Sequence, residues 1–231
     1  MSLLDAITRE AGQSSAAAEA AVVQLDYSQL QAFLAWVYGT ARVPQVWTTG
    51  FRDIAKPSWF GGSGLAQLQA RVPDPRQGDL YFCIGLLRPG AARRALGEVE
   101  AQPLLIVDDV PADTGRGRGS KVDRAKWDAM FAAGFPRPSF RVRTSPGNET
   151  WGWVLAGDDR APERRDELAL IRGWLIERGL TDAVMDETRY VRLPSGWNSK
   201  AKHRPEGAAV EASPAVGLVL EAGEPFPWER A

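Results

Sequence analysis

The chain has 231 residues, of which 44% are hydrophobic and nine are tryptophans, so a wholly disordered protein is excluded. Its 28 basic and 29 acidic residues leave a net charge of −1. Any contact with a polyanion must therefore come from local clusters of cations, because no global field attracts one.

The sequence has one cysteine, Cys83, and one histidine, His203, which disfavours a zinc site and a Ser-His or Cys-His hydrolase. Because Cys83 lies in the apolar run LYFCIGLL, we expect a buried free thiol and a reducing compartment. No run is long and apolar enough to span a bilayer. Residues 1–25 lack the basic head and apolar centre of a signal peptide, and we expect them to form a flexible Ala-rich arm or a loosely held helix.

The first predicted element is a helix over residues 26–39, because apolar side chains recur there at helical spacing and Gly39 closes the run. Residues 44–78 are rich in Trp, Gly and Pro; within them WTTGF favours a strand and KPSWFGGSG a loop. Residues 80–87 are a continuous apolar run, which is typical of a strand, and a short helix is expected after them.

The second half of the chain alternates predicted strands and helices. PLLIVDDVP is apolar on both faces until its two acids, which is typical of a central strand covered on both sides. After the Gly-rich basic loop DTGRGRGS we expect a helix over 121–134, a hairpin over 139–155, a helix over 161–179, and strands at 190–193 and 216–220. The order from residue 79 onward, β-α-β-α-β-β-α-β, indicates a layered α/β domain with a mixed sheet packed against helices.

Asp108 and Asp109 end the predicted central strand. Two ionised carboxylates there repel each other, and a hard divalent cation such as Mg²⁺ or Mn²⁺ would relieve the repulsion. The alternative is that the two acids merely cap the following loop. Adjacent residues on a regular strand point to opposite faces, so both acids can reach one ion only if the strand breaks at Val110-Pro111.

The hairpin turn TSPGNETW also carries groups that suit an anion. Ser145, Asn148 and Thr150 offer hydroxyl and amide groups, and Gly147 allows backbone N–H groups to approach a ligand closely. The alternative is a plain hairpin turn, because Pro-Gly-Asn is common turn chemistry.

The stretch TRYVRLPSGWNSK, residues 188–200, is crowded with cations and aromatic residues. Alternation along a strand predicts that Arg192 projects from the sheet with Tyr190, while Arg189 and Leu193 share the other face and Leu193 enters the core. The Pro-Ser-Gly turn then presents Asn198, Lys200 and Lys202, which together with Arg192 would make a phosphate-binding wall. A solvated basic loop is the alternative for the cations beyond the turn.

Asp182 and Asp186 directly precede this wall. Either could complete a carboxylate cluster with Asp108 and Asp109. A metal site beside a phosphate clamp suits phosphoryl or nucleotidyl transfer.

Taken in order, LLIVDDV, FRVRTSPGNETWGWVL and DAVMDETRYVRLPSGWNSK resemble the three motifs of the archaeo-eukaryotic primase superfamily, in its RepB-like and phage primase-polymerase branch. The similarity covers about residues 80–202, and the last stretch is the most specific, because it looks like that branch's Arg-Leu-Pro-Gly…Asn-x-Lys signature. The resemblance implies an RRM-like catalytic core with a mixed sheet, joined to an N-terminal α/β unit. It implies one catalytic domain over 26–231, with 26–78 as the N-terminal subregion and 79–221 as the core.

The resemblance further implies template-dependent nucleotidyl transfer on single-stranded DNA by a two-metal mechanism with Mg²⁺ or Mn²⁺, in a phage or mobile genetic element. By position, Asp108 and Asp109 fall in the first motif and Asp186 or Asp182 in the third, as catalytic and metal-binding acids. The nucleotide and its phosphates would be held by Ser145, Asn148, Thr150, Arg192, Asn198 and Lys200.

Template contacts are expected from cations along the chain and from stacked aromatic rings. Trp151 or Tyr190 is a candidate for base stacking, with burial in the core as the alternative. The cations expected at the nucleic acid are Arg116, Arg118, Lys121, Arg141, Arg143 and Lys202. Expected partners are nucleoside triphosphates, a single-stranded DNA template and a separate helicase, with no membrane, in the cytoplasm of a bacterial host cell.

The chain departs from the family pattern in all three motifs, and in the third the acid is either Asp182 or Asp186. The acids of the first motif are adjacent, where the family reads acid-x-acid. The second motif lacks the family's His, so that Asn148 or Thr150 would have to substitute. The missing His favours an alternative, a catalytically inactive primase-like replication factor that binds single-stranded nucleic acid. A nucleotide-binding enzyme that never touches nucleic acid is the third hypothesis.

Overall fold

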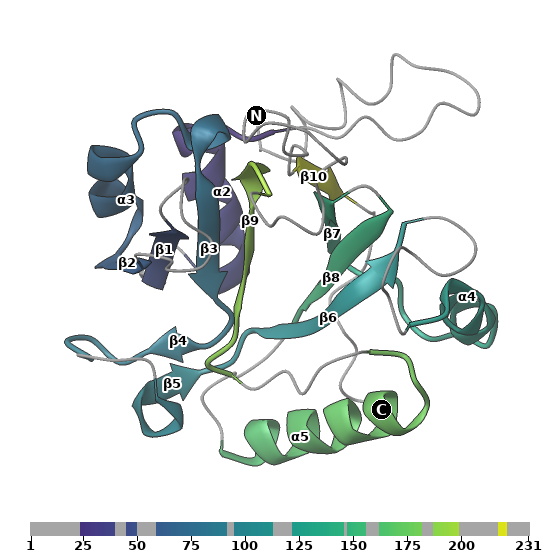
Figure 1. Cartoon of the computed structure of the whole chain (residues 1–231). Helices are drawn as coiled ribbons and strands as arrows, with labels where there is room; N and C mark the ends of the chain where they lie inside the picture. The colour runs from purple at the N-terminus through teal and green to yellow at the C-terminus, as the bar shows by residue number, and fades with distance from the viewer. Residues whose placement is uncertain are drawn as a thin grey trace.

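The computed structural model describes residues 24–39, 45–49, 59–91, 95–112, 122–145, 147–155, 162–181, 187–198 and 217–220. These residues form two four-stranded sheets, a two-stranded ribbon and helices (Figure 1). The predicted α+β class is confirmed. The described strand pairs are all antiparallel, however, where a mixed sheet was predicted.

The first sheet has the strand order β2-β1-β3-β9. It consists of β1 (Gln45–Thr49), β2 (Trp59–Ser63), β3 (Asp79–Cys83) and β9 (Tyr190–Gly196). Helix α2 (Tyr27–Tyr38) begins at a capping box in which the Asp26 side chain accepts a hydrogen bond from Gln29 N at 2.9 Å, and it ends at Gly39 as predicted. The shorter α3 (Leu65–Arg71) and the 3-10 turn η1 (Pro75–Gln77) lead into β3.

The second sheet has the strand order β10-β7-β8-β6. It consists of β6 (Leu104–Pro111), β7 (Phe140–Ser145), β8 (Asn148–Val154) and β10 (Gly217–Leu220), and α4 (Arg124–Ala132) and α5 (Pro162–Glu177) lie beside it (Figure 1). The hairpin, both helices and the last strand agree with the predictions. β6 was predicted as a central strand, but it lies at the edge of the described sheet. Its apolar run is explained by burial on both faces.

The predicted strand over 80–87 is broken in the structure. β3 ends at Cys83, and after a bend β4 (Leu86–Leu87) pairs with β5 (Val99–Ala101), which follows the 3-10 turn η2 (Leu96–Glu98). At Gly85 a Cβ atom would lie 2.5 Å from the Glu187 carbonyl oxygen, so only glycine fits where the chain passes this carbonyl.

Two apolar cores lie on the two faces of the second sheet. The central core joins α2 and both sheets: Phe33 of α2 makes edge-to-face contacts with Phe82 of β3 and Phe140 of β7. The outer core fills the other face of the second sheet, where Trp127 of α4 stacks on Trp153 of β8, with ring centroids 5.6 Å apart. Both sheets are thereby fixed around one shared interior.

The start of the described chain is held to β9. Leu25 is fully buried, although it was predicted in a flexible arm, and its carbonyl oxygen accepts a hydrogen bond from Ser195 Oγ at 2.7 Å. Gln24 Nε2 donates to the Gly196 carbonyl at 3.0 Å. The rest of the predicted arm and the Gly-rich loop lie outside the described residues. No helix in the described part of the chain has the length and apolar composition needed to cross a membrane.

Candidate active site

The paired acids lie at a β-bulge in β6. Val107 is opposite Trp151 and Val110 is opposite Glu149, so Asp108 and Asp109 together face the single residue Thr150 of β8. Asp109 has a φ of 60°, in the left-handed region, at a bulge where the backbone departs from regular strand geometry. The strand was expected to bring both acids to one ion only if it broke at Val110-Pro111. It instead remains paired through Pro111, and the irregularity falls on the acids themselves.

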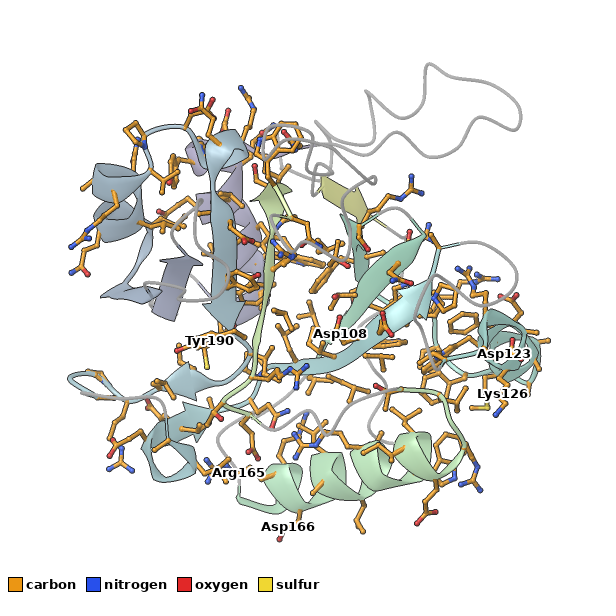
Figure 2. The ribbon with its side chains drawn as sticks, viewed as in Figure 1. Asp108, Asp123, Lys126, Arg165, Asp166 and Tyr190 are labelled. Atoms are coloured by element: carbon orange, nitrogen blue, oxygen red, sulfur yellow. The ribbon has the colours of Figure 1, made fainter. Side chains whose placement is uncertain are left out.

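Asp108 is held from both sides. Thr150 Oγ1 donates a hydrogen bond of 2.6 Å to Asp108 Oδ1, and Arg189 Nη2 lies 3.9 Å from Asp108 Oδ2. The Asp108 side chain is 31% exposed. Figure 2 shows Asp108 on the side of β6 that is turned toward β9, whose first residue is Tyr190. The carboxylate is thus oriented by the sheet and still open to a ligand.

Arg192 lies in a buried polar network on β9. Its guanidinium donates to the Asp79 carboxylate of β3, to the Trp197 carbonyl at 3.1 Å, and to Asn198 Oδ1 at 2.9 Å. Only 5% of its side chain is exposed. The Arg192 side chain therefore lies on the face of the sheet opposite Leu193, as predicted. In the structure, however, it is paired with the Asp79 carboxylate. Its phosphate-binding role stays a prediction.

The same network links the two sheets. Asn198 Nδ2 donates to the Thr144 carbonyl of β7 at 2.6 Å, so the residues after β9 are tied to the second sheet. The Arg192 guanidinium lies over the Tyr81 ring, 4.7 Å from its centroid. Burial raises the pKa of Tyr81; Arg192 opposes this shift, whereas the charges of Asp79 and Asp108 reinforce it. The pKa of Tyr81 therefore depends both on the Asp79–Arg192 pair and on Asp108 of the bulge.

Of the three polar residues predicted to bind a ligand at the hairpin turn, the structure places only Thr150 beside Asp108. Thr150 belongs to the site through its bond to Asp108. Ser145 and Asn148 are 1% and 2% exposed, and they pair with each other across the turn between β7 and β8. A nucleotide could reach these two side chains only after a rearrangement, so their binding role stays a prediction.

Arg141 and Arg143 lie on the opposite face of the second sheet from Asp108. They are opposite Trp151 and Glu149 in the β7–β8 register, whereas Thr150 is opposite Val142 of the central core. The fully buried Glu149 accepts from Arg141 Nη1 at 3.2 Å and lies 3.8 Å from Arg143 Nε. The two arginines thus neutralise a buried acid. The structure does not bring them to the candidate site.

Of the two predicted stacking residues, Trp151 is 1% exposed and packs in the outer core, which bears out the core alternative. Tyr190 is partly buried and packs against the small cluster of Cys83, Leu87 and Val99, and Cys83 is the buried free thiol that we expected. The remaining predicted site residues lie outside the described part of the chain: Arg116, Arg118, Lys121, Asp182, Asp186, Lys200 and Lys202.

The donors at the bulge fit a hard divalent cation as part of a site. Asp108 and Asp109 share one register position, and carboxylate oxygens are the ligands that Mg²⁺ and Mn²⁺ prefer. Within the described ranges no three His, Cys, Asp or Glu side chains gather. The predicted third acid, Asp182 or Asp186, falls in the segment 182–186 outside them.

Three residues near the acids were missed from the sequence. Arg189 was predicted to face the core, but it precedes β9, so strand alternation does not apply to it. Asp79 and Tyr81 belong to an apolar strand, and their pairing with Arg192 depends on contacts between distant segments. Of these three residues only Asp79 could have been noticed in the sequence. An acid at the start of a buried strand needs a cationic partner, although the sequence does not say which one.

The fold is similar to that of two solved primase domains. The primase-polymerase domain of cyanophage S-2L superimposes with a TM-score of 0.58 and 16% identity, covering 86% of this chain and 92% of that one. The catalytic domain of the primase RepB′, in complex with initiator DNA, gives a TM-score of 0.50 and 21% identity, with 86% of each chain covered. No family model matches the sequence, and no curated protein matches it.

Proposed function

We propose that the chain is a primase-polymerase that extends DNA on a single-stranded template by nucleotidyl transfer. The observation that carries this proposal is the bulge in β6, which places two adjacent acids opposite Thr150 and beside Arg189. Catalytic domains of primases share the fold around it. We further propose that the protein serves a phage or mobile genetic element in a bacterial cytoplasm, with a separate helicase as a candidate partner.

In this proposal Asp108 and Asp109 hold Mg²⁺ or Mn²⁺, with Asp186 or Asp182 as the third acid of a two-metal site. The bound ions would activate the attacking hydroxyl group and neutralise the triphosphate. Thr150 fixes the orientation of Asp108, and the Asp79–Arg192–Asn198 network fixes the turn after β9 against β7. Lys200 is the predicted phosphate ligand beyond that turn.

The template is proposed to lie along cations of the segments that follow β6 and β9. Arg116, Arg118, Lys121 and Lys202 remain the candidates, since Arg141 and Arg143 are committed to Glu149. The complex of the primase RepB′ catalytic domain with initiator DNA supports DNA as the class of partner. Contacts to several phosphates would give a steep loss of affinity with increasing salt.

A primer-extension assay with Mg²⁺ or Mn²⁺ tests the proposal. We expect synthesis by the wild-type protein and its loss in Asp108→Ala and Asp109→Ala. Asp166→Ala is the matched control, because Asp166 is an exposed acid on α5 (Figure 2). Synthesis that survives both substitutions would reject the site. Absence of synthesis on any template with either metal would reject the activity.

The alternative, a non-catalytic binding factor, is favoured by one observation. The second motif has no His, and both residues that would have to substitute for it, Asn148 and Thr150, are almost fully buried, with the Thr150 hydroxyl already bonded to Asp108. This alternative predicts salt-dependent binding of single-stranded DNA that Asp108→Ala leaves unchanged, together with no extension under any condition. A fluorescence anisotropy titration alongside the extension assay separates the two functions.

A further inference from the structure

Two arginines of the segment around β9 differ in what they can reach. Arg192 is 5% exposed and donates to three acceptors, whereas the Arg189 side chain is 41% exposed and forms an ion pair with Asp108. A ligand that arrives from solvent can engage Arg189 without breaking a buried network. The exposed arginine was not among the residues expected to bind phosphate.

The backbone that carries Arg189 is fixed, although its side chain is open. The Arg189 carbonyl accepts from Ile84 N at 3.0 Å, and the Glu187 carbonyl accepts from Gly85 N at 2.8 Å. Arg172 of α5 adds an ion pair to Glu187 at 3.7 Å. Only rotation about the side-chain bonds of Arg189 is therefore needed to redirect its guanidinium.

The contact between Arg189 and Asp108 is weak enough to be exchanged. At 3.9 Å between partly exposed groups, such a pair contributes little to stability, because water screens it. A guanidinium binds phosphate through two parallel charge-assisted hydrogen bonds, which are stronger. Asp108 in turn offers a divalent cation the same oxygen, Oδ2, that now lies toward Arg189.

We propose that Arg189 and the divalent cation exchange places at Asp108, and that the released guanidinium binds the triphosphate of the incoming nucleotide. In the ligand-free protein Arg189 neutralises Asp108. When the cation occupies that carboxylate, Arg189 turns to the phosphates, so the cation and the nucleotide bind with positive coupling. This inference rests on the proposed function, because it takes its two ligands from it.

Isothermal titration calorimetry on the full chain, with MnCl₂ alone and with dATP or ATP in the presence of Mn²⁺, tests the exchange. In Arg189→Gln we expect the nucleotide dissociation constant to rise about tenfold or more, because a charge-assisted contact is lost. We expect the dissociation constant for Mn²⁺ alone to fall about two- to fivefold, because a competing cation is gone. Arg189→Lys, which keeps the charge but not the planar fork, should give a smaller loss of nucleotide affinity.

The control is Arg88→Gln, which removes another exposed arginine from an ion pair, with Glu98 at 3.4 Å. It should leave both affinities unchanged, and circular dichroism checks that each variant is folded. If the wild type binds both ligands and folded Arg189→Gln is indistinguishable from it, this inference is overturned and the proposed function stands. If the wild type binds neither ligand, the proposed function fails and takes the inference with it.

Discussion

Asp109 has an unusual backbone conformation, which accompanies its position in the bulge of β6. Its φ is 60°, and among the described residues it is the only one other than glycine with a positive φ. Such conformations are unfavourable for most side chains and cluster at functional sites. Here the conformation follows from the bulge, which gives both acids the position opposite Thr150.

Asp109→Gly should therefore separate stability from activity. Glycine adopts positive φ without steric cost, so we expect the free energy of unfolding to stay equal or to rise by up to about 1 kcal/mol. Asp108→Gly is the control. It places glycine at a residue without positive φ and also removes the acceptor of the Thr150 hydroxyl, so it should lower that free energy by about 1–2 kcal/mol. Urea denaturation measures both, and primer extension should be lost in both.

Thr150 is expected to act through Asp108. Thr150→Val keeps the branched shape that suits a strand but removes the hydroxyl that donates to Asp108 Oδ1. We expect the Mn²⁺ dissociation constant to rise about tenfold, as for other residues that orient metal ligands, with about 1 kcal/mol lost from the free energy of unfolding. Thr150→Ser, which restores a donor, should recover most of the affinity. Equal Mn²⁺ affinities in the wild type and Thr150→Val would show that the hydroxyl does not orient the ligand.

The residues of the site were predictable only in part. Asp108 could be identified, because an acid that ends a buried apolar run needs an explanation that the local sequence does not supply. The surroundings of Arg192 could not, since its partner Asp79 lies 113 residues away along the chain. Arg189 was missed because the strand begins one residue after it, and a face assigned by alternation changes with such a boundary.

The turn that ends β9 is fitted against the turn that precedes β3. Trp197 N donates to the Gly78 carbonyl at 2.8 Å, and a Cβ on Gly196 would lie 2.0 Å from that same oxygen. Gly196 also has a φ of 103°. The residues that carry Asn198 toward β7 are thus positioned by backbone contact, which a side chain at 196 would prevent.

Gly196→Ala tests this fit against a matched control. Gly134 has a similar φ of 94° but nothing within 4 Å of an added Cβ, so Gly134→Ala isolates the conformational strain, at about 1–2 kcal/mol. Gly196→Ala adds a clash with backbone and should lower the free energy of unfolding by about 1–3 kcal/mol more. Equal losses in the two variants would mean that the turn moves freely away from Gly78.

Local signals predicted most helices and strands, because their causes lie within a few residues. Gly39 at the end of α2, the apolar spacing of α5 and the turn between β7 and β8 are examples. The arrangement of the strands was not predictable in this way. The division into two sheets and the position of β6 at an edge depend on pairings between distant segments, and the break after Cys83 depends on Glu187.

Tyr38 lies in the central core that joins the two sheets, and Tyr27 packs against that core, so the burial of these tyrosines bears on the stability of the whole fold. Burial, and to a lesser degree the charge of Asp74, raise the pKa of Tyr27 from 10.0 to about 12, and its hydroxyl donates to the Val72 carbonyl at 2.5 Å. Burial likewise raises the pKa values of Tyr38 and Tyr81. The folded protein therefore retains phenolic protons that the unfolded chain releases.

This difference predicts alkaline sensitivity with a definite sign. Below pH 10 the Tyr27 hydroxyl is protonated in both the folded and the unfolded state, so its contribution to the free energy of unfolding is at its full value. Between pH 10 and about 12 the unfolded chain loses its proton first, so the free energy of unfolding falls. Denaturant titrations at a series of alkaline pH values measure the slope, and Tyr27→Phe should reduce it. A slope that Tyr27→Phe leaves unchanged would rule out a contribution from this group.

The bulge in β6 also has a genetic consequence. Because two residues face Thr150 alone, deleting codon 109 would leave Val107, Asp108 and Val110 opposite Trp151, Thr150 and Glu149 in an uninterrupted ladder. The side chains that follow would keep their faces, so a thermal melt of the deletion variant should still show a folded protein, now with a single acid. Conversely, inserting one Asp codon after an Asp in a regular antiparallel strand would place two carboxylates at one position of the sheet and leave the rest of the strand pairing unchanged.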